Sequence, residues 1–298
     1  MKHTFTTGKE LLKFTKKHKV NISDAMLLYE ISYSGKTEEW IKDRMLKRYE
    51  IMKAAIYKGV KSTKKSASHM SGGNAKKMFK EIKNSKKYFL NRLALKAISY
   101  AIATGETNAC MGRIVAFPTA GASGVVPSLL VALEEDQRLS KEKILDALFN
   151  AAGIGLIIAE NATLAGAEGG CQAEIGSAAA MAASAVTEIH GGTPEQCLNA
   201  AALALKNMLG LACDPIGGMV EVPCIKRNAF AAMYALTASD MTMAGIESYV
   251  PFDEVVVAMR NIGKLISSKL RETAMGGLAV TKTGENVKKK LGFKENGN

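Results

Sequence analysis

The sequence is poor in aromatic residues and has no long uninterrupted apolar stretch. Phe, Trp and Tyr make up 6% of the 298 residues, so the core must be built mainly from other side chains. Pro118 and Pro127 interrupt the most apolar region, residues 114–133. A membrane-spanning helix needs about 20 consecutive apolar residues. We therefore expect no membrane-spanning helix and no membrane partner.

An apolar leader and an even number of cysteines are also lacking. The first ten residues are polar and charged, and the chain contains five cysteines. Secreted proteins held together by disulfides usually combine a leader with paired cysteines. We therefore predict a cytoplasmic protein, in which reduced cysteines serve as ligands or core residues.

Several common metal and nucleotide motifs are absent. No C-x2-C pair occurs, which argues against zinc knuckles and ferredoxin-type cluster runs. His190 is the only histidine near the later cysteines. The glycine spacings of a phosphate-binding Walker loop and of a dinucleotide fingerprint are missing too. No nucleotide is implied.

The net charge of +12 is unevenly distributed. Residues 1–100 hold 24 basic and 8 acidic residues, whereas residues 101–250 hold 7 basic and 15 acidic residues. Lysines spread over amphipathic helices usually form a solvated face. Interleaved aromatic residues and zinc-finger spacings, which would favour nucleic acid, are absent. We predict no nucleic-acid partner, and an acidic protein partner explains the basic excess equally well.

The core is expected to consist mainly of Ala, Leu, Ile, Val and Met, and these apolar residues recur at helical spacing. This composition favours helices, and no stretch alternates with the period of a strand for more than a few residues. The prediction is an all-α protein with one compact helical domain over residues 1–298. It divides into a basic N-terminal part, about 1–105, and a Gly- and Cys-rich core, about 106–280. Helices are expected at 8–20, 23–33, 37–57, 75–84, 89–104, 125–134, 141–159, 171–189, from 194, at 223–244, 252–270 and 285–291.

Three helix starts have recognisable signals. Ser23 and Ser140 are candidate N-caps. Thr193-Pro194 followed by Gln196 combines an N-cap threonine, a first-turn proline and a capping-box glutamine. Cys197 belongs to the apolar stripe of the helix that follows, so we predict it to be a core residue.

Glycine-rich loops precede two of the expected helices. Residues 119–124 offer hydroxyls, from Thr119 and Ser123, and open backbone N–H groups around Gly121. Such a loop either cradles a carboxylate or forms a tight structural turn. The second loop ends in Gly169-Gly170-Cys171, directly before an alanine-rich helix. A helix N-terminus favours negative charge and therefore stabilises a cysteine thiolate.

Three cysteines stand at expected junctions between loops and helices. Cys171, Cys213 and Cys224 are separated by 42 and 11 positions. Free cysteines are often simply buried, and that explanation remains open from the residues alone. The alternative is a metal cluster with an incomplete set of protein ligands, in which one iron stays open to act as a Lewis acid.

The chain resembles the alpha subunit of the two-subunit, iron–sulfur-dependent bacterial L-serine dehydratases. The similarity extends over almost the whole length, in matching order and spacing. The matching stretches are residues 111–127, 169–177, 191–196, 205–215, 220–229, 271–273 and 276–279.

This resemblance implies an enzyme and its cofactor. It implies a 4Fe-4S cluster on Cys171, Cys213 and Cys224, within the core of residues 106–280. It also implies a lyase that converts L-serine into pyruvate and ammonia without pyridoxal phosphate, together with a beta subunit. Hydroxide is a poor leaving group, so an open iron on the serine hydroxyl would help it to leave while a base removes the α-proton.

Other roles are less narrowly defined. The favoured base of the family resembles a histidine of the beta portion, so the base in this chain is unknown and His69 is a weak candidate. Its loop ends in Asn74 where the family usually has aspartate. The serine carboxylate has two candidate sites. These are the 119–124 loop, with Thr119, Gly121 and Ser123, and the residues Lys226, Arg227 and Asn228, whose alternative location is a helix surface.

Two departures and two rival functions complete the prediction. Single-chain relatives have a late cysteine able to cap the fourth iron, but no cysteine follows Cys224 here. The basic N-terminal third is also unusual. A pyridoxal-dependent dehydratase would need an α/β fold with a phosphate cup, which the helical pattern disfavours. A non-catalytic iron–sulfur or regulatory subunit of a dehydratase complex remains the alternative.

Overall fold

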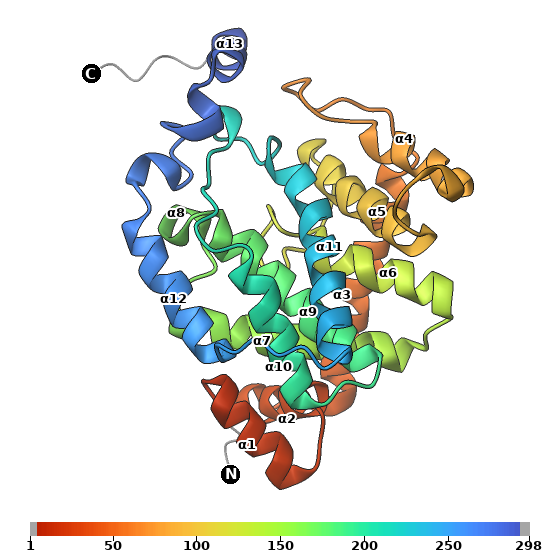
Figure 1. Cartoon of the computed structure of the whole chain (residues 1–298). Coiled ribbons are helices and arrows are strands. Elements are labelled where there is room, and N and C mark those ends of the chain that lie inside the picture. Colours follow the sequence, from red (N-terminus) through yellow and green to blue (C-terminus); the bar gives the residue numbers. More distant parts are fainter. Residues whose placement is uncertain (1–4, 293–298) are drawn as a thin grey trace.

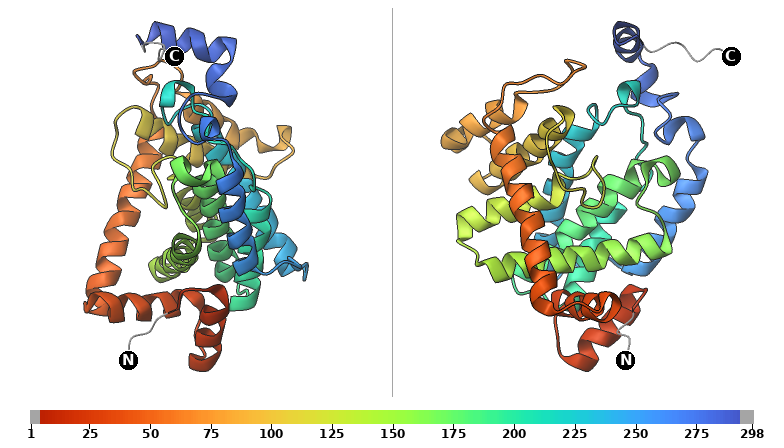
Figure 2. Two further views of the ribbon diagram at one scale, coloured as in Figure 1. Left: turned by 90° about the vertical axis from the view of Figure 1, so that its left-hand side faces the viewer. Right: turned by 180° about the vertical axis from the view of Figure 1, so that it is seen from behind.

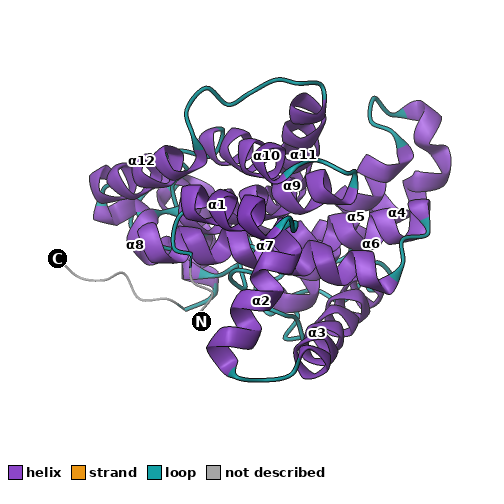
Figure 3. Ribbon diagram, turned by 90° about the horizontal axis from the view of Figure 1, so that it is seen from below, coloured by secondary structure: helices purple, strands orange, loops and turns teal. Residues whose placement is uncertain are grey.

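The structure, a computed structural model, describes residues 5–292 as a bundle of helices joined by loops (Figures 1 and 3). Within that range there are thirteen α-helices and no β-strand, which confirms the predicted all-α class. The α-helices are α1 (Gly8–His18), α2 (Ile22–Ser34), α3 (Glu38–Gly59), α4 (Asn74–Glu81), α5 (Arg92–Ala109), α6 (Val125–Gln137), α7 (Lys141–Asn161), α8 (Gly166–Gly169), α9 (Ser177–Ile189), α10 (Pro194–Lys206), α11 (Cys224–Met243), α12 (Phe252–Leu265) and α13 (Lys282–Lys290). The short turns are η1 (Ile82–Lys87), the π turn η2 (Gln172–Gly176), η3 (Ile216–Gly218), η4 (Ser268–Leu270) and η5 (Gly277–Val280).

Helix α9 lies at the centre of the molecule. It packs against α6, α7, α10 and α11 (Figure 1). All residues from Ser177 to Thr187 are buried, and most of them are alanine. A helix that is apolar all round belongs in a core, and its small side chains let neighbouring helices approach from several sides.

The N-terminal helices form a frame around this centre. Helix α3 stands along one side, above α2, and α1 lies at the end of the molecule that carries the N-terminus (Figure 2). The division expected near residue 105 falls inside α5. That helix packs against α3 and α4 as well as α6 and α11. One cluster of buried apolar side chains extends from Phe5 to Met259.

The local start signals are largely confirmed. Ser140 caps α7 by accepting the Lys143 N–H at 3.3 Å. Thr193 and Gln196 form the expected capping box at α10. Ser23 is not a cap, because α2 already begins at Ile22 and the capping box is formed by Asn21 and Asp24. Ser23 is buried inside the first turn.

Several helix bounds differ from the sequence prediction by two or more residues, and two of these differences lie next to the cysteines. The helix expected over 252–270 ends at Leu265, and Ile266 is extended with ψ 128°. The chain then reaches Cys213, and the pairing with that segment replaces further helical turns. The helix predicted over 171–189 starts later, at Ser177, because residues 172–176 form a π turn directly after Cys171. Such turns often mark functional sites.

Among the described residues, 5–292, one helix is long and apolar enough to cross a membrane. This helix is α7, and 67% of its most apolar stretch is buried inside the protein. It packs against α2 and α9. The core of the fold therefore accounts for its apolar composition.

Candidate metal centre

Cys171, Cys213 and Cys224 converge from three separate parts of the chain. Cys171 directly precedes the π turn η2, Cys213 lies in an extended segment, and Cys224 is the first residue of α11. Their exposed fractions are 1%, 2% and 5%. The Cys171 and Cys213 thiols are near enough for each to shift the pKa of the other, and Cys224 is close enough for the charge of Cys171 to raise its pKa. We call these three residues the cysteine site.

Glycines allow the backbone to crowd around this site. Gly170 has φ +76°, and a side chain there would place its Cβ 2.9 Å from the Leu211 carbonyl oxygen. A Cβ on Gly166 would lie 3.1 Å from the Cys213 sulfur and 2.7 Å from a Glu174 oxygen. Only glycine combines that backbone conformation with such close approaches. Gly170, directly before Cys171, and Gly166 therefore have a steric reason.

The backbone of Cys213 pairs with the chain near Arg271. The Cys213 N–H donates to the Leu270 carbonyl at 2.8 Å, and the Glu272 N–H donates to the Cys213 carbonyl at 2.8 Å. The Arg271 side chain reaches the Glu168 carbonyl at 3.4 Å, beside the loop that carries Cys171. The segment around Arg271, 58 positions after Cys213, is therefore part of the site's framework.

Arg227 on α11 holds the segment on both sides of Cys213. Its guanidinium donates to the Ala212 carbonyl at 2.8 Å and to the Asp214 carboxylate at 3.1 Å. Asp214 also accepts the Leu278 N–H at 2.9 Å. Arg227 approaches Cys171 as well, where its positive charge favours a thiolate. The sequence makes Arg227 a candidate for binding the serine carboxylate, and in the structure its donors contact Ala212 and Asp214 beside Cys213.

The thiol pKa values differ strongly within the site. The neighbouring Cys213 thiol lowers the pKa of Cys171, with help from Arg227 and against the effect of burial. The neighbouring Cys171 sulfur, together with burial, raises the pKa of Cys213. Burial, and then the charge of Cys171, raises the pKa of Cys224 to about 12. Among the three cysteines, the surrounding protein therefore favours the thiolate form only at Cys171.

The donor set is suited to iron–sulfur chemistry rather than to a single ion. Within residues 5–292, no three His, Cys, Asp or Glu side chains lie close enough together to hold one metal ion. Thiolates that hold a multi-iron cluster bind different iron atoms and are spaced more widely. Three buried sulfurs are the soft type of ligand that iron–sulfur clusters use.

Glu174 is a site residue that the sequence reasoning missed. The Cys213 thiol donates to its carboxylate at 3.9 Å. Burial raises its pKa, while the nearby Thr119 hydroxyl partly offsets that rise. Its position three residues after Cys171 was a usable signal, because residues i and i+3 of a helical turn share a face. An acidic residue inside an apolar helical stretch was the second signal.

Asn228 connects the 119–124 loop to α11. Its Nδ2 donates to the carbonyls of Gly121 at 2.6 Å and Cys224 at 2.9 Å, and its Oδ1 accepts the Gly124 N–H at 2.9 Å. These bonds occupy both amide hydrogens and the carbonyl oxygen. Asn228 thus places the loop beside the cysteine site, and a Cβ on Gly121 would lie 3.5 Å from Glu174.

The remaining substrate candidates differ in their surroundings. The Ser123 hydroxyl is buried and donates to the Ala120 carbonyl at 2.8 Å. The Thr119 hydroxyl is buried without a well-formed hydrogen bond, so it is the available hydroxyl of the loop. Lys226 is exposed on α11. His69 is exposed in the 66–74 loop with φ 61°, and its imidazole bonds to no described residue.

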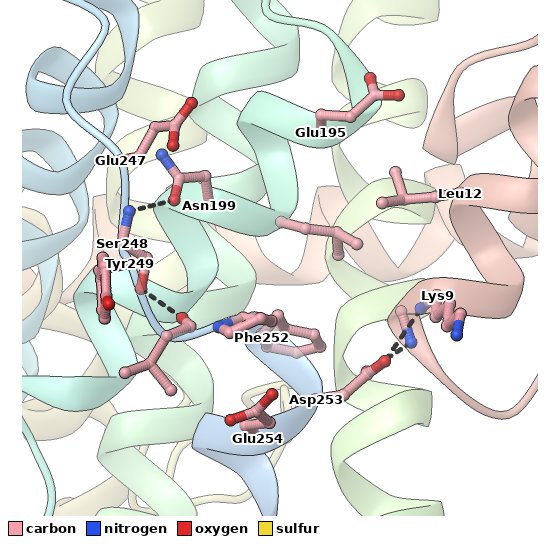
Figure 4. A pocket seen from close by; sticks show the side chains of 14 residues that line it. Lys9, Leu12, Glu195, Asn199, Glu247, Ser248, Tyr249, Phe252, Asp253 and Glu254 are labelled. Carbon is pink, nitrogen blue, oxygen red and sulfur yellow. Dashed lines mark hydrogen bonds between the residues drawn. The ribbon is translucent and has the colours of Figure 1, made fainter.

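A separate cleft of about 620 Å³ contains none of these residues. It lies between α1, α10 and the chain that leads from α11 into α12 (Figure 4). There, the Asp253 carboxylate accepts the backbone N–H groups of Gly8 at 2.6 Å and Lys9 at 3.0 Å. No cysteine lines this cleft. The candidate metal centre is therefore defined by the converging cysteines and not by cavity size.

Comparison with known proteins gives a consistent result. The family model described as "Serine dehydratase alpha chain" matches residues 17–279. The "Probable L-serine dehydratase, alpha chain" of Bacillus subtilis (strain 168) is 47% identical, over 96% of this chain and 95% of that protein. The "L-serine dehydratase, alpha chain" of Peptoniphilus asaccharolyticus is 43% identical, over 95% and 97%. The "L-serine dehydratase" of Streptomyces coelicolor is 38% identical, over 94% of this chain but 62% of that protein.

Proposed function

The chain belongs to the serine dehydratase alpha chain family, and we propose that it is the cluster-binding subunit of an L-serine ammonia-lyase. The net reaction converts L-serine into pyruvate and ammonia. Loss of the α-proton and the hydroxyl group releases water and an enamine, which hydrolyses to the keto acid and ammonia. The observation that supports this proposal is the convergence of three buried cysteines beside Arg227 and Glu174.

The proposed cofactor is a 4Fe-4S cluster held by Cys171, Cys213 and Cys224. When bound, it would supply an iron Lewis acid for the serine hydroxyl. This route does not use pyridoxal phosphate, whose phosphate cup is typical of α/β folds; the described residues contain no sheet. Arg227 would keep the thiolate-bearing segments together and offset part of their negative charge.

The chain's own residues suggest how serine is oriented. Glu174 contacts the cysteine site, so its carboxylate is suitably placed for the ammonium group of the amino acid. The 119–124 loop faces Glu174 and offers the Thr119 hydroxyl and nearby N–H groups for the carboxylate. Ser123, Gly121 and Asn228 keep this loop in place, and Lys226 remains a candidate only from the exposed side of α11.

The α-proton base and the second subunit belong to the same proposal. We propose that a beta subunit supplies a histidine base, with His69 as the in-chain alternative. The Streptomyces relative contains sequence beyond its matched 62%, as expected if a separate chain provides that part here. The basic N-terminal helices offer a surface for an acidic partner. The cytoplasm stays the predicted compartment.

Anaerobic purification with a candidate beta subunit tests the proposal. The complex should be brown, its visible absorbance should change when L-serine is added, and pyruvate should form. A colourless, iron-free complex after anaerobic expression with iron would contradict it. Iron binding without pyruvate formation would instead favour the non-catalytic iron–sulfur or regulatory subunit.

A further inference from the structure

Two buried carboxylates, those of Glu106 and Glu221, hold the ends of the 66–74 loop in place. Glu106, 4% exposed, accepts the backbone N–H groups of Gly72, Gly73, Asn74 and Ala75 at 2.8 to 3.2 Å. This carboxylate also caps the N-terminus of α4, where negative charge is favourable. The C-terminal half of the loop is thereby fixed to α5, which contains Glu106.

Glu221 holds the other part of the same loop. Its carboxylate, in a residue that is 7% exposed, accepts the Ser68 hydroxyl at 2.8 Å and also the Ser71 hydroxyl. Burying a carboxylate is unfavourable unless hydrogen bonds compensate for its lost hydration. Two hydroxyl donors from one loop provide that compensation, so the position of the loop and the burial of Glu221 depend on each other.

Glu221 also belongs to the start of the helix that carries Cys224. Its carbonyl accepts the Ile225 N–H at 3.0 Å, which is the first hydrogen bond of α11. Only two residues separate Glu221 from Cys224. The side chain of Glu221 therefore binds the 66–74 loop while its backbone helps to place a cysteine of the metal centre.

The tip of the loop, unlike its two hydrogen-bonded ends, is exposed. His69 is exposed in a left-handed conformation, φ 61°, and its side chain bonds to no described residue. Such a conformation is uncommon for a residue other than glycine, although histidine adopts it more readily than most. The loop therefore combines two ends that are fixed by hydrogen bonds with an exposed polar side chain at its tip.

We propose that Glu221 is a positioning residue that fixes the 66–74 loop against the Cys224 segment, so that the loop forms one wall of the serine site. The inference rests on the proposed function for its substrate. The 66–74 loop would then join the 119–124 loop as a second segment of the serine site that carries none of the three cysteines. Ser68 and Ser71 are the groups through which Glu221 acts.

Two variants and a matched control test this arrangement in the complex with its partner. Glu221→Gln keeps the shape but removes the charge that both hydroxyls bond to. The double variant Ser68→Ala/Ser71→Ala removes the donors and leaves Glu221. Glu188→Gln is the control, because Glu188 is also a largely buried carboxylate with hydrogen bonds to another segment, at Ile22 and Asn150. It lies about 25 Å along the helix from Cys171, at 1.5 Å per residue.

The first readout is hydrogen exchange of residues 66–75 without substrate. Both test variants should exchange faster there, by about tenfold for the loss of one charge-assisted hydrogen bond, and the control should not. Unchanged exchange in both variants would overturn the proposal. This measurement does not depend on serine turnover, so it tests the coupling even if the proposed function is wrong.

The second readout is the split between KM and kcat for L-serine, with iron content measured in parallel. Both test variants should raise KM about tenfold, with unchanged iron content, and Ser68→Thr/Ser71→Thr should restore KM by restoring the hydroxyls. Faster exchange with unchanged KM and kcat would show that the loop is not a wall of the serine site. Loss of iron in Glu221→Gln would show that Glu221 only supports Cys224. Either result would overturn the proposal.

Discussion

The two ends of the central helix α9 each carry a partly buried glutamate near a buried cysteine. Glu174, in the π turn at the N-terminal end, contacts Cys213, and Glu188 at the C-terminal end lies near Cys197. Burial raises the pKa of both carboxyls. Burial also raises the pKa of Cys197, as it does for Cys224. Burial and perturbed pKa values are therefore common to both ends.

The two ends differ in what surrounds these groups. At the Cys171 end, three chain segments each contribute a cysteine, and Arg227 brings a positive charge. At the Glu188 end, the carboxylate accepts the Ile22 N–H at 3.1 Å and the Asn150 amide at 2.7 Å. Cys197 is fully buried in the apolar core there, as the sequence predicted. Convergence of ligand-type side chains with a counter-charge distinguishes the site from the core.

Replacing cysteines at the two ends should give the largest contrast. Cys171→Ala, Cys213→Ala and Cys224→Ala should each abolish iron binding and pyruvate formation, because a three-thiolate ligand set cannot lose a member. Cys197→Ala should retain both. Iron content after anaerobic purification and a pyruvate assay provide the measurement. Equal damage from Cys197→Ala would contradict the ligand assignment.

Removing the arginine charge should have the next largest effect. Arg227→Leu leaves Asp214 buried without its ion-pair partner, which costs about 3–5 kcal/mol, and it frees the segment around Cys213. We expect a lower Tm and less than full iron occupancy. Arg227→Lys keeps the charge but not the two-sided contact, so it should fall between wild type and Arg227→Leu. Full iron occupancy in Arg227→Leu would exclude a role for Arg227 in holding the site.

Exchanging the two glutamates for glutamine compares the ends directly. Glu174→Gln removes the charge proposed to meet the serine ammonium group, so KM for L-serine should rise about tenfold or more. Glu188→Gln should leave KM unchanged. Steady-state kinetics on complexes with equal iron content measure this difference. An unchanged KM in Glu174→Gln would place the ammonium contact elsewhere.

The smallest expected effect is a pH dependence at the far end of α9. Because burial raises the pKa of Glu188 above its usual 4.5, the folded protein binds this proton more tightly than the unfolded chain. The resulting stabilisation is fully present below pH 4.5 and is lost as the pH rises through the folded-state pKa. The Tm of the wild type should therefore fall relative to the Tm of Glu188→Gln as the pH rises. A constant difference would show that Glu188 does not titrate in this way.

Local sequence signals were sufficient for most helices. The capping box at Thr193 and the cap at Ser140 depend on residues within one turn, and both were predicted correctly. The predicted end of the helix over 252–270 was wrong, because the chain after Leu265 leaves the helix and pairs with Cys213. That pairing joins residues 58 positions apart and has no local pattern.

The sequence by itself determined the helical class, the central alanine-rich helix and, through the family resemblance, which three cysteines to compare. These follow from side-chain periodicity, capping chemistry and motif order, all of which are local. Only the tertiary structure decided that Arg227 braces Cys213 and that Asn228 holds the 119–124 loop. It also decided that Glu174 lies beside Cys213 and that Glu221 binds the 66–74 loop. Those roles arise where distant segments pack together, because a buried charge must find its partner wherever the fold places it.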